Sequence, residues 1–572
     1  MGLGEVLILA NEHERVLPAL LRLDLLKLRR TSLVATCGAY GQTEFMPAKL
    51  PPSIFNDVVG PVMRGPSSSH SAASVRIGRL VRDLCGGAPD SVLIEFDTEG
   101  ALATTHTSQG SDIGMFGGLL GWEADDARLP DSQAALEAAG IELEIRLAEL
   151  HDPHPNTYRF TLRKGSNDHS LIALSTGGGM IEVIEVDGTP VSLHGDYAVT
   201  LLDVLDDGAS TAAILRERDD IDEVQIAGTS PVRIICKAQA FVSGDVLKEL
   251  PAVQRVRLLD AVLPVRSRKG LTVPFLHASE MLALGDPQQR KLSDFALDYE
   301  CARAGIGPDA VLEQMRKILV IVRAGVKEGL AGTEYADRIL PRQSHNFAAK
   351  LERGELLDGG ILNRAILYVT ALMEVKSSMG VIVAAPTAGS CATFPATCLA
   401  AAEVQGSSED QTLRAMLAAG LIGVFTATRS SFAAEVGGCQ AETGAGAAMA
   451  AAALVELAGG NAAQGLGAAS QALQNVLGLV CDPVANRVEA PCLGRNVAGA
   501  ANALACANMS LAGYDHLIPL DEVLDAHREI SENMARELRC TALGGLSITP
   551  TSKAIEARLC GTSEGCGSGG CG

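Results

Sequence analysis

The second half of the chain contains a long series of segments rich in alanine, glycine and leucine, and this series restricts the fold more than any other feature. From about residue 271 to 550 the apolar residues recur with helical spacing, as in DAVLEQMRKILVIVRAGVKEGL. Several segments are apolar around much of their circumference, so their helices must be covered by neighbouring helices. With only 3% aromatic residues, the cores must consist of small and aliphatic side chains. We therefore expect a mainly α-helical domain over residues 267–555.

The breaks between these helices carry the residues that can do chemistry: PTAGSC at 386–391, EVGGCQAETG, VCDPVANR and APCLGRN. Three of them supply Cys439, Cys481 and Cys492. The steps are 42 (481 − 439) and 11 (492 − 481), so the thiols come from separate chain breaks. Three converging thiolates would hold an iron–sulfur cluster with one open iron, which suits Lewis-acid chemistry. The alternative is that buried free cysteines act as small hydrophobic residues.

Residues 51–195 read as an α+β domain. SVLIEFDTEG, IELEIRLAEL and YRFTLRK have the pattern of strands, whereas LVRDLCGG and DSQAALEAAG have the pattern of helices. The domain opens with GPSSSH at 65–70, just before an amphipathic helix. Hydroxyls and free N–H groups at a helix start bind anions, so Ser67, Ser68 and Ser69 are candidates for holding a carboxylate.

His70 beside this candidate anion site can accept a proton near neutral pH, which makes it a candidate base. The plainer alternative is that Ser69 only caps the helix and His70 is an exposed first-turn residue. Two further loops, TTHTSQGSDIG at 104–114 and HDPHPNTYRF at 151–160, put polar residues, including Asn156, where side chains reach a cleft. Turn chemistry alone explains the second loop equally well.

Residues 196–266 predict a small α/β sandwich. The expected order is βαββαβ, with strands in YAVTLLDVL, EVQIAGTSPVRIICKA and VQRVRLLDAVL and helices in ASTAAILRE and SGDVLKELP. This order suggests the ACT regulatory type, which often binds amino acids. A spacer domain is the alternative, because fold analogy is a weak guide to function.

The two ends of the chain are less informative. Residues 1–50 form a leader of unknown role, bounded by Pro51 and Pro52. Residues 556–572 form a flexible tail rich in cysteine and glycine. Cys571 in this tail could reach back to an open iron as a removable fourth ligand, or the tail is simply disordered.

The formal charge of −21 and the pI near 5.0 argue against nucleic acid and anionic membrane surfaces as partners. The start of the chain lacks the order of a secretory signal, and the apolar stretches are broken before they could span a bilayer. We expect a cytoplasmic protein whose cysteines are thiols or ligands and not a disulfide framework. We also expect a homo-oligomer, a dimer.

Taken together, these motifs resemble the iron–sulfur-dependent L-serine dehydratases, or L-serine ammonia-lyases, over most of positions 55 to 550. GPSSSH is similar to the carboxylate-binding signature of the family, and HPNT at 154–157 is also similar. SMGVIVAAPTAGSC at 378–391 resembles the substrate-binding loop. Cys439, Cys481 and Cys492 fall where the three cluster ligands of the family do, within CQAE, CDPV and PCLGRN.

The resemblance implies a [4Fe–4S] cluster, no pyridoxal phosphate, and deamination of L-serine to pyruvate and ammonia in amino-acid degradation and gluconeogenesis. His70 would be the catalytic base. The expected substrate-binding residues are Ser67, Ser68, Ser69, Asn156, Thr387, Gly389 and Arg495.

The chain departs from the family at three positions that bear on the substrate. Gln109 replaces a histidine, Lys376 replaces an asparagine, and Ala392 replaces a more usual glycine. Two other functions therefore stay open. One is an iron–sulfur lyase acting on another β-substituted amino acid. The other is a non-catalytic amino-acid sensor that uses the ACT-like domain.

Overall fold

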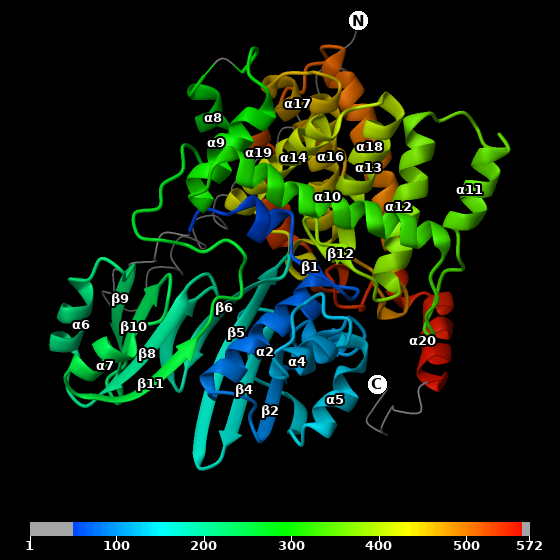
Figure 1. The fold of residues 1–572 in the computed structure, drawn as a ribbon. Coiled ribbons are helices and arrows are strands. Elements are labelled where there is room, and N and C mark those ends of the chain that lie inside the picture. The colour runs from blue at the N-terminus through cyan, green and yellow to red at the C-terminus, as the bar shows by residue number, and fades with distance from the viewer. Residues whose placement is uncertain (1–49, 286, 563–572) are drawn as a thin grey trace, which may run out of the picture. The chain divides into compact units, whose positions relative to one another are not determined.

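The computed structural model describes residues 50–285 and 287–562, so the leader up to residue 49 and the end of the chain with Cys571 lie outside the described residues. Two β-sheets come from the first half of the described chain and a helical assembly from the second (Figure 1). This confirms a multidomain protein with a mixed α/β N-terminal region and a helical C-terminal region.

The N-terminal region is built on a six-stranded sheet in the order β3-β2-β4-β5-β6-β7. β2 and β3 are parallel, and the other neighbouring pairs are antiparallel. Helices α2 and α4 pack against each other through close backbone contacts, since a Cβ on Gly118 would lie 2.3 Å from the carbonyl oxygen of Val75. The elements are β2 (Ser91–Asp97), β3 (Glu142–Ala148), β4 (Thr157–Lys164), β5 (Asn167–Gly177), β6 (Met180–Val186), β7 (Thr189–Leu193), α2 (Ala73–Leu84), α3 (Leu102–Thr105), α4 (Ser111–Leu119) and α5 (Ser132–Ala138).

The sequence patterns predicted β2, β3 and β4, and the structure adds β5, β6 and β7, which continue the sheet as a meander. A local signal for this meander is present in the sequence. Asp187 and Gly188 both have positive φ, 47° and 71°, as a two-residue hairpin turn requires. Asp-Gly between two apolar runs is therefore the clue that indicates β6 and β7.

The second sheet has the predicted βαββαβ order of elements. Its strands are all antiparallel and lie in the order β11-β8-β10-β9. One face of this sheet packs against its own two helices, α6 (Ala209–Arg216) and α7 (Gly244–Glu249). On the other face, Leu201, Ile235 and Leu259 belong to the hydrophobic core of the six-stranded sheet. The elements are β8 (Ala198–Val204), α6 (Ala209–Arg216), β9 (Glu223–Ala227), β10 (Val232–Ala238), α7 (Gly244–Glu249) and β11 (Val253–Leu259).

Small residues allow the helices of the C-terminal region to pack closely. A Cβ on Gly329 of α10 would lie 2.2 Å from the carbonyl oxygen of Ala371 on α12. Helix α16 is buried from Ala445 to Glu456, as expected for a helix that is apolar on all sides. The longer helices are α8 (Ala278–Ala283), α9 (Leu292–Ala304), α10 (Pro308–Ala331), α11 (Ser344–Glu352), α12 (Ile361–Ser377), α13 (Thr393–Gln405), α14 (Glu409–Arg429), α16 (Ala445–Leu457), α17 (Ala462–Gln474), α18 (Cys492–Leu511), α19 (Leu520–Asn533) and α20 (Pro550–Thr562).

One apolar stretch expected to continue as helix does not. The segment ILNRAILYVTALMEVKSSMGVIVAA is helical only to Ser377, after which Met379 takes a positive φ of 62° and Gly380 follows. The chain then forms the short strand β12 (Ile382–Val383), which pairs antiparallel with β1 (Val62–Met63). This pairing joins the α+β region to the helical region, and it brings the SSSH turn beside the PTAGS loop.

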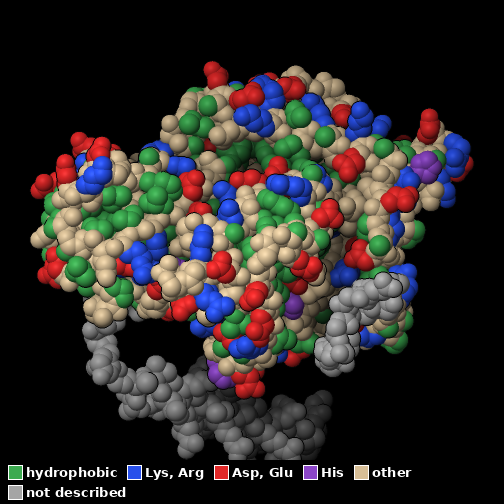
Figure 2. Space-filling view, turned by 60° about the horizontal axis from the view of Figure 1, so that its bottom comes forward, with side chains coloured by type: hydrophobic (Ala, Val, Ile, Leu, Met, Phe, Trp, Pro, Cys, Tyr) green, Lys and Arg blue, Asp and Glu red, His purple; other side chains and the backbone are tan. Residues whose placement is uncertain are grey.

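The surface of the described chain carries both signs of charge. Acidic and basic side chains are interspersed across the face shown in Figure 2, with hydrophobic side chains between them. Among the described residues, no helix combines the length and the apolar character needed to cross a membrane.

A buried carboxyl group in α9 gives a prediction about stability. Glu300 accepts hydrogen bonds from the Ser53 hydroxyl at 2.6 Å and from the Ile54 N–H at 2.8 Å, and burial raises its pKa from 4.5 to about 7. A raised folded-state pKa contributes stability that is complete below pH 4.5 and is lost as pH rises through 7. Over that window the loss amounts to roughly 3 kcal/mol.

Glu300→Gln is therefore expected to remove this part of the pH dependence. The difference in Tm between pH 5 and pH 8, measured by thermal denaturation, should be smaller in the variant than in the wild type. Glu352→Gln, at an exposed glutamate of α11, is the control and should leave the difference unchanged. Equal differences in wild type and Glu300→Gln would contradict the assigned titration.

Candidate active site

The SSSH turn lies at the start of α2, within the short helical turn η2 (Ser68–Ala72). Gly65, which begins the motif, has a φ of 105°, and a Cβ there would lie 2.4 Å from the Ser71 hydroxyl, so this position requires glycine. Ser68 accepts a hydrogen bond from the backbone N–H of Ala388 at 3.2 Å. The Ser175 hydroxyl donates to the Ser69 carbonyl at 2.7 Å. These contacts fix the turn against both the sheet and the PTAGS loop.

His70 is fully buried, and its two ring nitrogens have different partners. The Nε2 atom lies 2.7 Å from the Thr105 hydroxyl, which itself donates to the Ala101 carbonyl at 2.6 Å. Because that hydroxyl hydrogen is already used, Thr105 accepts from Nε2–H. The lone pair of neutral His70 is therefore on Nδ1.

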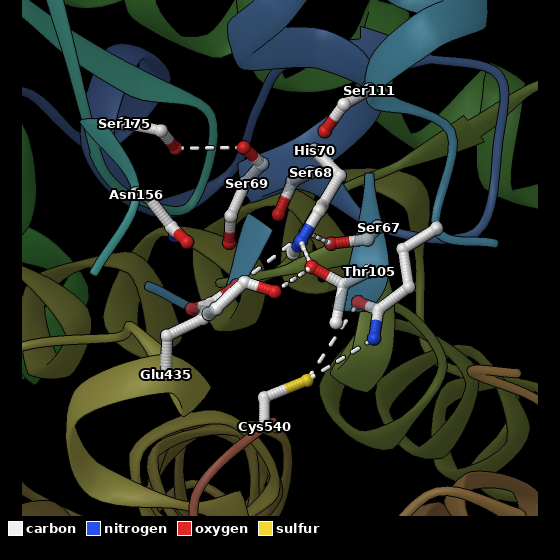
Figure 3. Close-up of polar contacts among 12 residues, drawn as sticks. Ser67, Ser68, Ser69, His70, Thr105, Ser111, Asn156, Ser175, Glu435 and Cys540 are labelled. Atoms are coloured by element: carbon white, nitrogen blue, oxygen red, sulfur yellow. Dashed lines mark hydrogen bonds and ion pairs between the residues drawn. The ribbon is translucent and has the colours of Figure 1, made fainter. Parts of the chain in front are cut away.

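The Nδ1 atom of His70 faces two groups. The Ser67 hydroxyl lies 2.9 Å away and a carboxylate oxygen of Glu435 lies 3.4 Å away (Figure 3). Burial lowers the pKa of His70 below 6.5, and the charge of Glu435 acts in the opposite direction. A neutral imidazole whose Nδ1 lone pair lies beside a carboxylate can take up a proton and hold it as an ion pair.

Asn156 comes from the HPNT loop and is fully buried, yet neither polar atom of its side chain has a hydrogen-bond partner among the described residues. In Figure 3 its side chain extends toward the same space as Ser69 and Glu435. The second oxygen of Glu435 is likewise unpartnered within the described chain. Buried amides normally form hydrogen bonds, so these orphaned atoms indicate a place for a polar ligand.

Asn156→Ala is expected to weaken substrate binding without a matching loss of stability. A lost hydrogen bond to a charged substrate group would raise KM by about 10- to 100-fold. The control is Asn56→Ala, because the side chain of buried Asn56 bonds both the N–H and the carbonyl of Val265, at 2.9 and 2.7 Å. That variant should lower Tm more than Asn156→Ala and leave KM unchanged. An unchanged KM in Asn156→Ala, together with a raised KM in Asn56→Ala, would count against a substrate-binding role of Asn156.

The PTAGS loop meets the thiol-bearing part of the helical region through Glu442. The Thr387 hydroxyl donates to Glu442 at 2.7 Å, and the Gly389 carbonyl accepts from the side chain of Asn496 at 2.8 Å. A Cβ on Gly389 would lie 2.7 Å from the Glu442 carboxyl group, so glycine is needed for this approach. Burial, assisted by the charge of Cys439, raises the pKa of Glu442 to about 8.

Backbone hydrogen bonds connect the three chain segments that carry Cys439, Cys481 and Cys540. The N–H of Gln440 donates to the Leu479 carbonyl at 2.9 Å, and the N–H of Cys481 donates to the Leu538 carbonyl at 2.8 Å. The N–H of Cys540 donates to the Ala434 carbonyl at 3.3 Å. As a result Cys439, Cys481 and Cys540 pack into one buried cluster, in which the thiol of Cys481 contacts both others.

Cys492 begins α18 and is also buried. Arg495, one turn later, donates to the Cys439 sulfur at 3.1 Å and pairs with Asp482. The hydrogen bond from Cys481 and the charge of Arg495 lower the pKa of Cys439. The contacts of Cys481 with Cys439 and Cys540 raise the pKa of Cys481. The first thiolate of this coupled pair therefore forms on Cys439. The Arg495 guanidinium thus lies at the thiols.

These thiols have the chemistry that an iron–sulfur cluster requires. Cys439, Cys481 and Cys492 are free and buried, and the lowered pKa of Cys439 favours the thiolate, which is the form that binds iron. Within residues 50–285 and 287–562 no group of three or more His, Cys, Asp or Glu side chains is arranged to hold one metal ion. A cluster places each thiolate on a different iron, so its ligands need not converge on one point.

The sequence patterns did not identify Thr105, Glu435 or Cys540. Thr105 lies in the TTHTSQGSDIG loop and Glu435 lies in the EVGGCQAETG break. Both segments stand out in the sequence, but nothing in their local pattern marks these two residues as functional. Cys540 stands alone in RELRCTALGG, where no neighbouring residue signals chemistry. Only its contacts with Cys481 and Gln109 reveal its place.

The three residues that depart from the family pattern are all buried. The Gln109 amide donates to Cys540 at 3.3 Å and to Asn486 at 3.2 Å. Lys376 donates to the Val488 carbonyl, four residues before Cys492. Ala392 precedes α13 beside the PTAGS loop. Gln109 and Lys376 therefore lie next to the thiol-bearing segments.

Comparison with known proteins agrees with this arrangement. The family model "Serine dehydratase alpha chain" matches residues 254–547. The "Probable L-serine dehydratase, alpha chain" of Bacillus subtilis is 37% identical over 291 residues, covering 51% of this chain and 97% of that protein. The corresponding "beta chain" of Bacillus subtilis is 38% identical over 150 residues, covering 26% of this chain and 67% of that protein.

A single-chain relative covers both regions. The "L-serine dehydratase" of Streptomyces coelicolor is 32% identical over 496 residues, covering 85% of this chain and 96% of that protein. The α+β region with its SSSH turn and the helical region with its thiols thus belong to one homologous unit. The chain is a member of the L-serine dehydratase family of the iron–sulfur type.

Proposed function

We propose that this protein is a lyase that deaminates L-serine to pyruvate and ammonia by β-elimination of water, with a [4Fe–4S] cluster as cofactor. Membership of the L-serine dehydratase family supports the substrate. The observation that carries the proposal is the buried His70, whose unprotonated Nδ1 faces Ser67 and Glu435 in a space that also contains the unpartnered Asn156 side chain.

The substrate carboxylate would bind at the SSSH turn. Ser67, Ser68 and Ser69 present hydroxyl and backbone groups there, and the Asn156 amide offers both a donor and an acceptor. Thr387 and Gly389 lie on the adjoining loop, linked to the turn through the Ala388 N–H. A zwitterionic amino acid needs both anion and cation partners, and the carboxylate of Glu435 suits its ammonium group.

Elimination requires a base for the weakly acidic Cα proton. His70 would take this proton on Nδ1, while Thr105 holds the ring through Nε2. The negative charge of Glu435 at 3.4 Å stabilises the imidazolium that results. Because the site is buried, the proton is kept from exchange with bulk water until the product leaves.

Cys439, Cys481 and Cys492 would hold the cluster, and Arg495 would stabilise the Cys439 thiolate. When bound, the cluster supplies a Lewis acid that makes the substrate hydroxyl a better leaving group. The initial product, aminoacrylate, tautomerises and hydrolyses to pyruvate and ammonia. Neither step requires pyridoxal phosphate.

The test is anaerobic purification followed by iron and sulfide analysis and a pyruvate assay. L-serine should yield pyruvate without added pyridoxal phosphate, and L-threonine serves as the comparison substrate. A protein that contains the cluster but forms no keto acid from either amino acid would refute the proposed reaction.

A second candidate is a related lyase for another β-substituted amino acid. Gln109 and Lys376 favour it, because they place an amide and an ammonium group beside the thiol-bearing segments where the family has histidine and asparagine. A screen of β-substituted amino acids under anaerobic conditions decides between the two, by the ratio of kcat/KM values.

We further propose the domain limits 51–195, 196–266 and 267–555, with the middle domain of ACT type. The strand order β11-β8-β10-β9 supports this type. The acidic charge and the free thiols support a cytoplasmic location. A homodimer is also proposed, and size-exclusion chromatography with light scattering tests it.

A further inference from the structure

We infer that Cys540 is a fourth thiol ligand of the iron–sulfur cluster in the substrate-free protein. This inference rests on the proposed function, because it presumes a cluster held by Cys439, Cys481 and Cys492. It concerns a residue that lies inside the fold and not in the tail that carries Cys571.

The first argument is position. The Cys540 side chain is 4% exposed and packs in one buried cluster with Cys439 and Cys481, in contact with the thiol of Cys481. Its backbone N–H is bonded to the Ala434 carbonyl, five residues before Cys439. The fold therefore brings Cys540 to two of the three expected ligands, Cys439 and Cys481. Four thiolates are the usual ligand set of a [4Fe–4S] cluster.

The second argument is direction. The Gln109 amide contacts the Cys540 sulfur at 3.3 Å, and the Gln109 backbone N–H donates to the carbonyl of Thr105 at 2.9 Å. Thr105 in turn accepts from His70. Cys540 thus lies on the side of the thiols that faces His70, and its thiol extends into that space in Figure 3. A substrate held beside His70 would approach the cluster from this side.

The third argument is chemistry. The Gln109 side-chain N–H donates to the Cys540 sulfur at 3.3 Å, and the Cys540 thiol donates to the Gln109 amide oxygen at 3.7 Å. The N–H contact can persist when the sulfur binds iron, because it uses a sulfur lone pair and not the thiol proton. Coordination releases the thiol proton to solvent and involves no change in oxidation state. Cys540, held by Gln109, would thereby bind the one iron that Cys439, Cys481 and Cys492 leave without a protein ligand.

The test compares wild type, Cys540→Ala, Cys571→Ala and Cys506→Ala after anaerobic reconstitution with ferrous iron and sulfide. Each protein is analysed for iron, oxidised briefly with limiting ferricyanide and examined by electron paramagnetic resonance. An iron held by three thiolates only is lost on mild oxidation and leaves a three-iron cluster with its own resonance. Cys506 is a buried cysteine of α18 that contacts Asn475 and Asn502, so it serves as the matched control.

We expect the three-iron signal to be at least about fivefold stronger in Cys540→Ala than in wild type and Cys506→Ala, because one iron loses its thiolate. Equal signals in wild type and Cys540→Ala, with a cluster in both, would overturn the inference and leave the proposed function standing. A strong signal in Cys571→Ala alone would assign the fourth ligand to the tail instead. A wild-type protein that binds no cluster would refute the proposed cofactor itself.

Discussion

Replacing Cys481 with alanine is expected to abolish both the visible absorbance of the cluster and the formation of pyruvate from L-serine. The Cys481 thiol contacts those of Cys439 and Cys540, so the substitution removes the central sulfur of the group. A methyl group cannot bind iron. With Cys540 serving the remaining iron, only Cys439 and Cys492 are left of the three thiolates that hold the cluster, and the cofactor is expected to be lost. Activity should therefore fall to the background of the assay.

The measurement is made on anaerobically reconstituted protein, by absorbance, iron content and pyruvate formation. Cys506→Ala is again the matched control, because this cysteine is equally buried but lies in α18 among Asn475 and Asn502. It should keep cluster and activity. If Cys481→Ala retained both properties, Cys481 would not be a ligand. Circular dichroism shows whether each variant is folded.

Replacing His70 with asparagine is expected to lower kcat by about 10²- to 10⁴-fold, the range that a positioned general base contributes. Asparagine can keep a hydrogen bond to Thr105 but cannot accept the Cα proton. The visible absorbance and iron content should match those of the wild type, because the side-chain partners of His70 among the described residues are Ser67, Thr105 and Glu435. A near-normal kcat in His70→Asn would remove it as the base.

The pH profile gives a second readout of the same residue. The base form of His70 is neutral, and burial lowers its pKa below 6.5. In wild type, kcat/KM should therefore decline only as pH falls below 6.5, and this acid limb should be absent from the residual activity of His70→Asn. His169→Asn is the control, since His169 is also buried but pairs with Asp187 outside the site. It should leave the limb in place.

Local pattern was sufficient for much of the fold. The apolar run at 309–330 predicted a helix that is observed as α10 (Pro308–Ala331), because its spacing is a property of neighbouring residues. The βαββαβ order after Gly195 was also read from alternation and turn residues alone. The stretch after Ser377 was misread because its apolar residues fit either a buried helix or a short strand, and only pairing with β1 decides between them.

For the candidate site too, local motifs indicate some of the residues, and only the tertiary structure shows the others. The SSSH and CQAE motifs indicated His70 and Cys439 as chemical groups, because unusual residue types at chain breaks are visible in the sequence. Their partners were not visible. Glu435 faces His70 across 365 positions (435 − 70), at a distance of 3.4 Å between the carboxylate oxygen and Nδ1. No local pattern encodes such a contact.

The sequence by itself determined the helical C-terminal region, the mixed α/β N-terminal region and the three spaced thiols, because each depends on residues close together in the chain. The tertiary structure alone decided what those thiols meet. It set the Nδ1 atom of His70 against Glu435, left Asn156 without a partner within the described chain, and brought Cys540 to Cys481. These are contacts between segments far apart in the chain, which the pairing of β1 with β12 and the backbone hydrogen bonds to Leu479 and Leu538 hold close together in space.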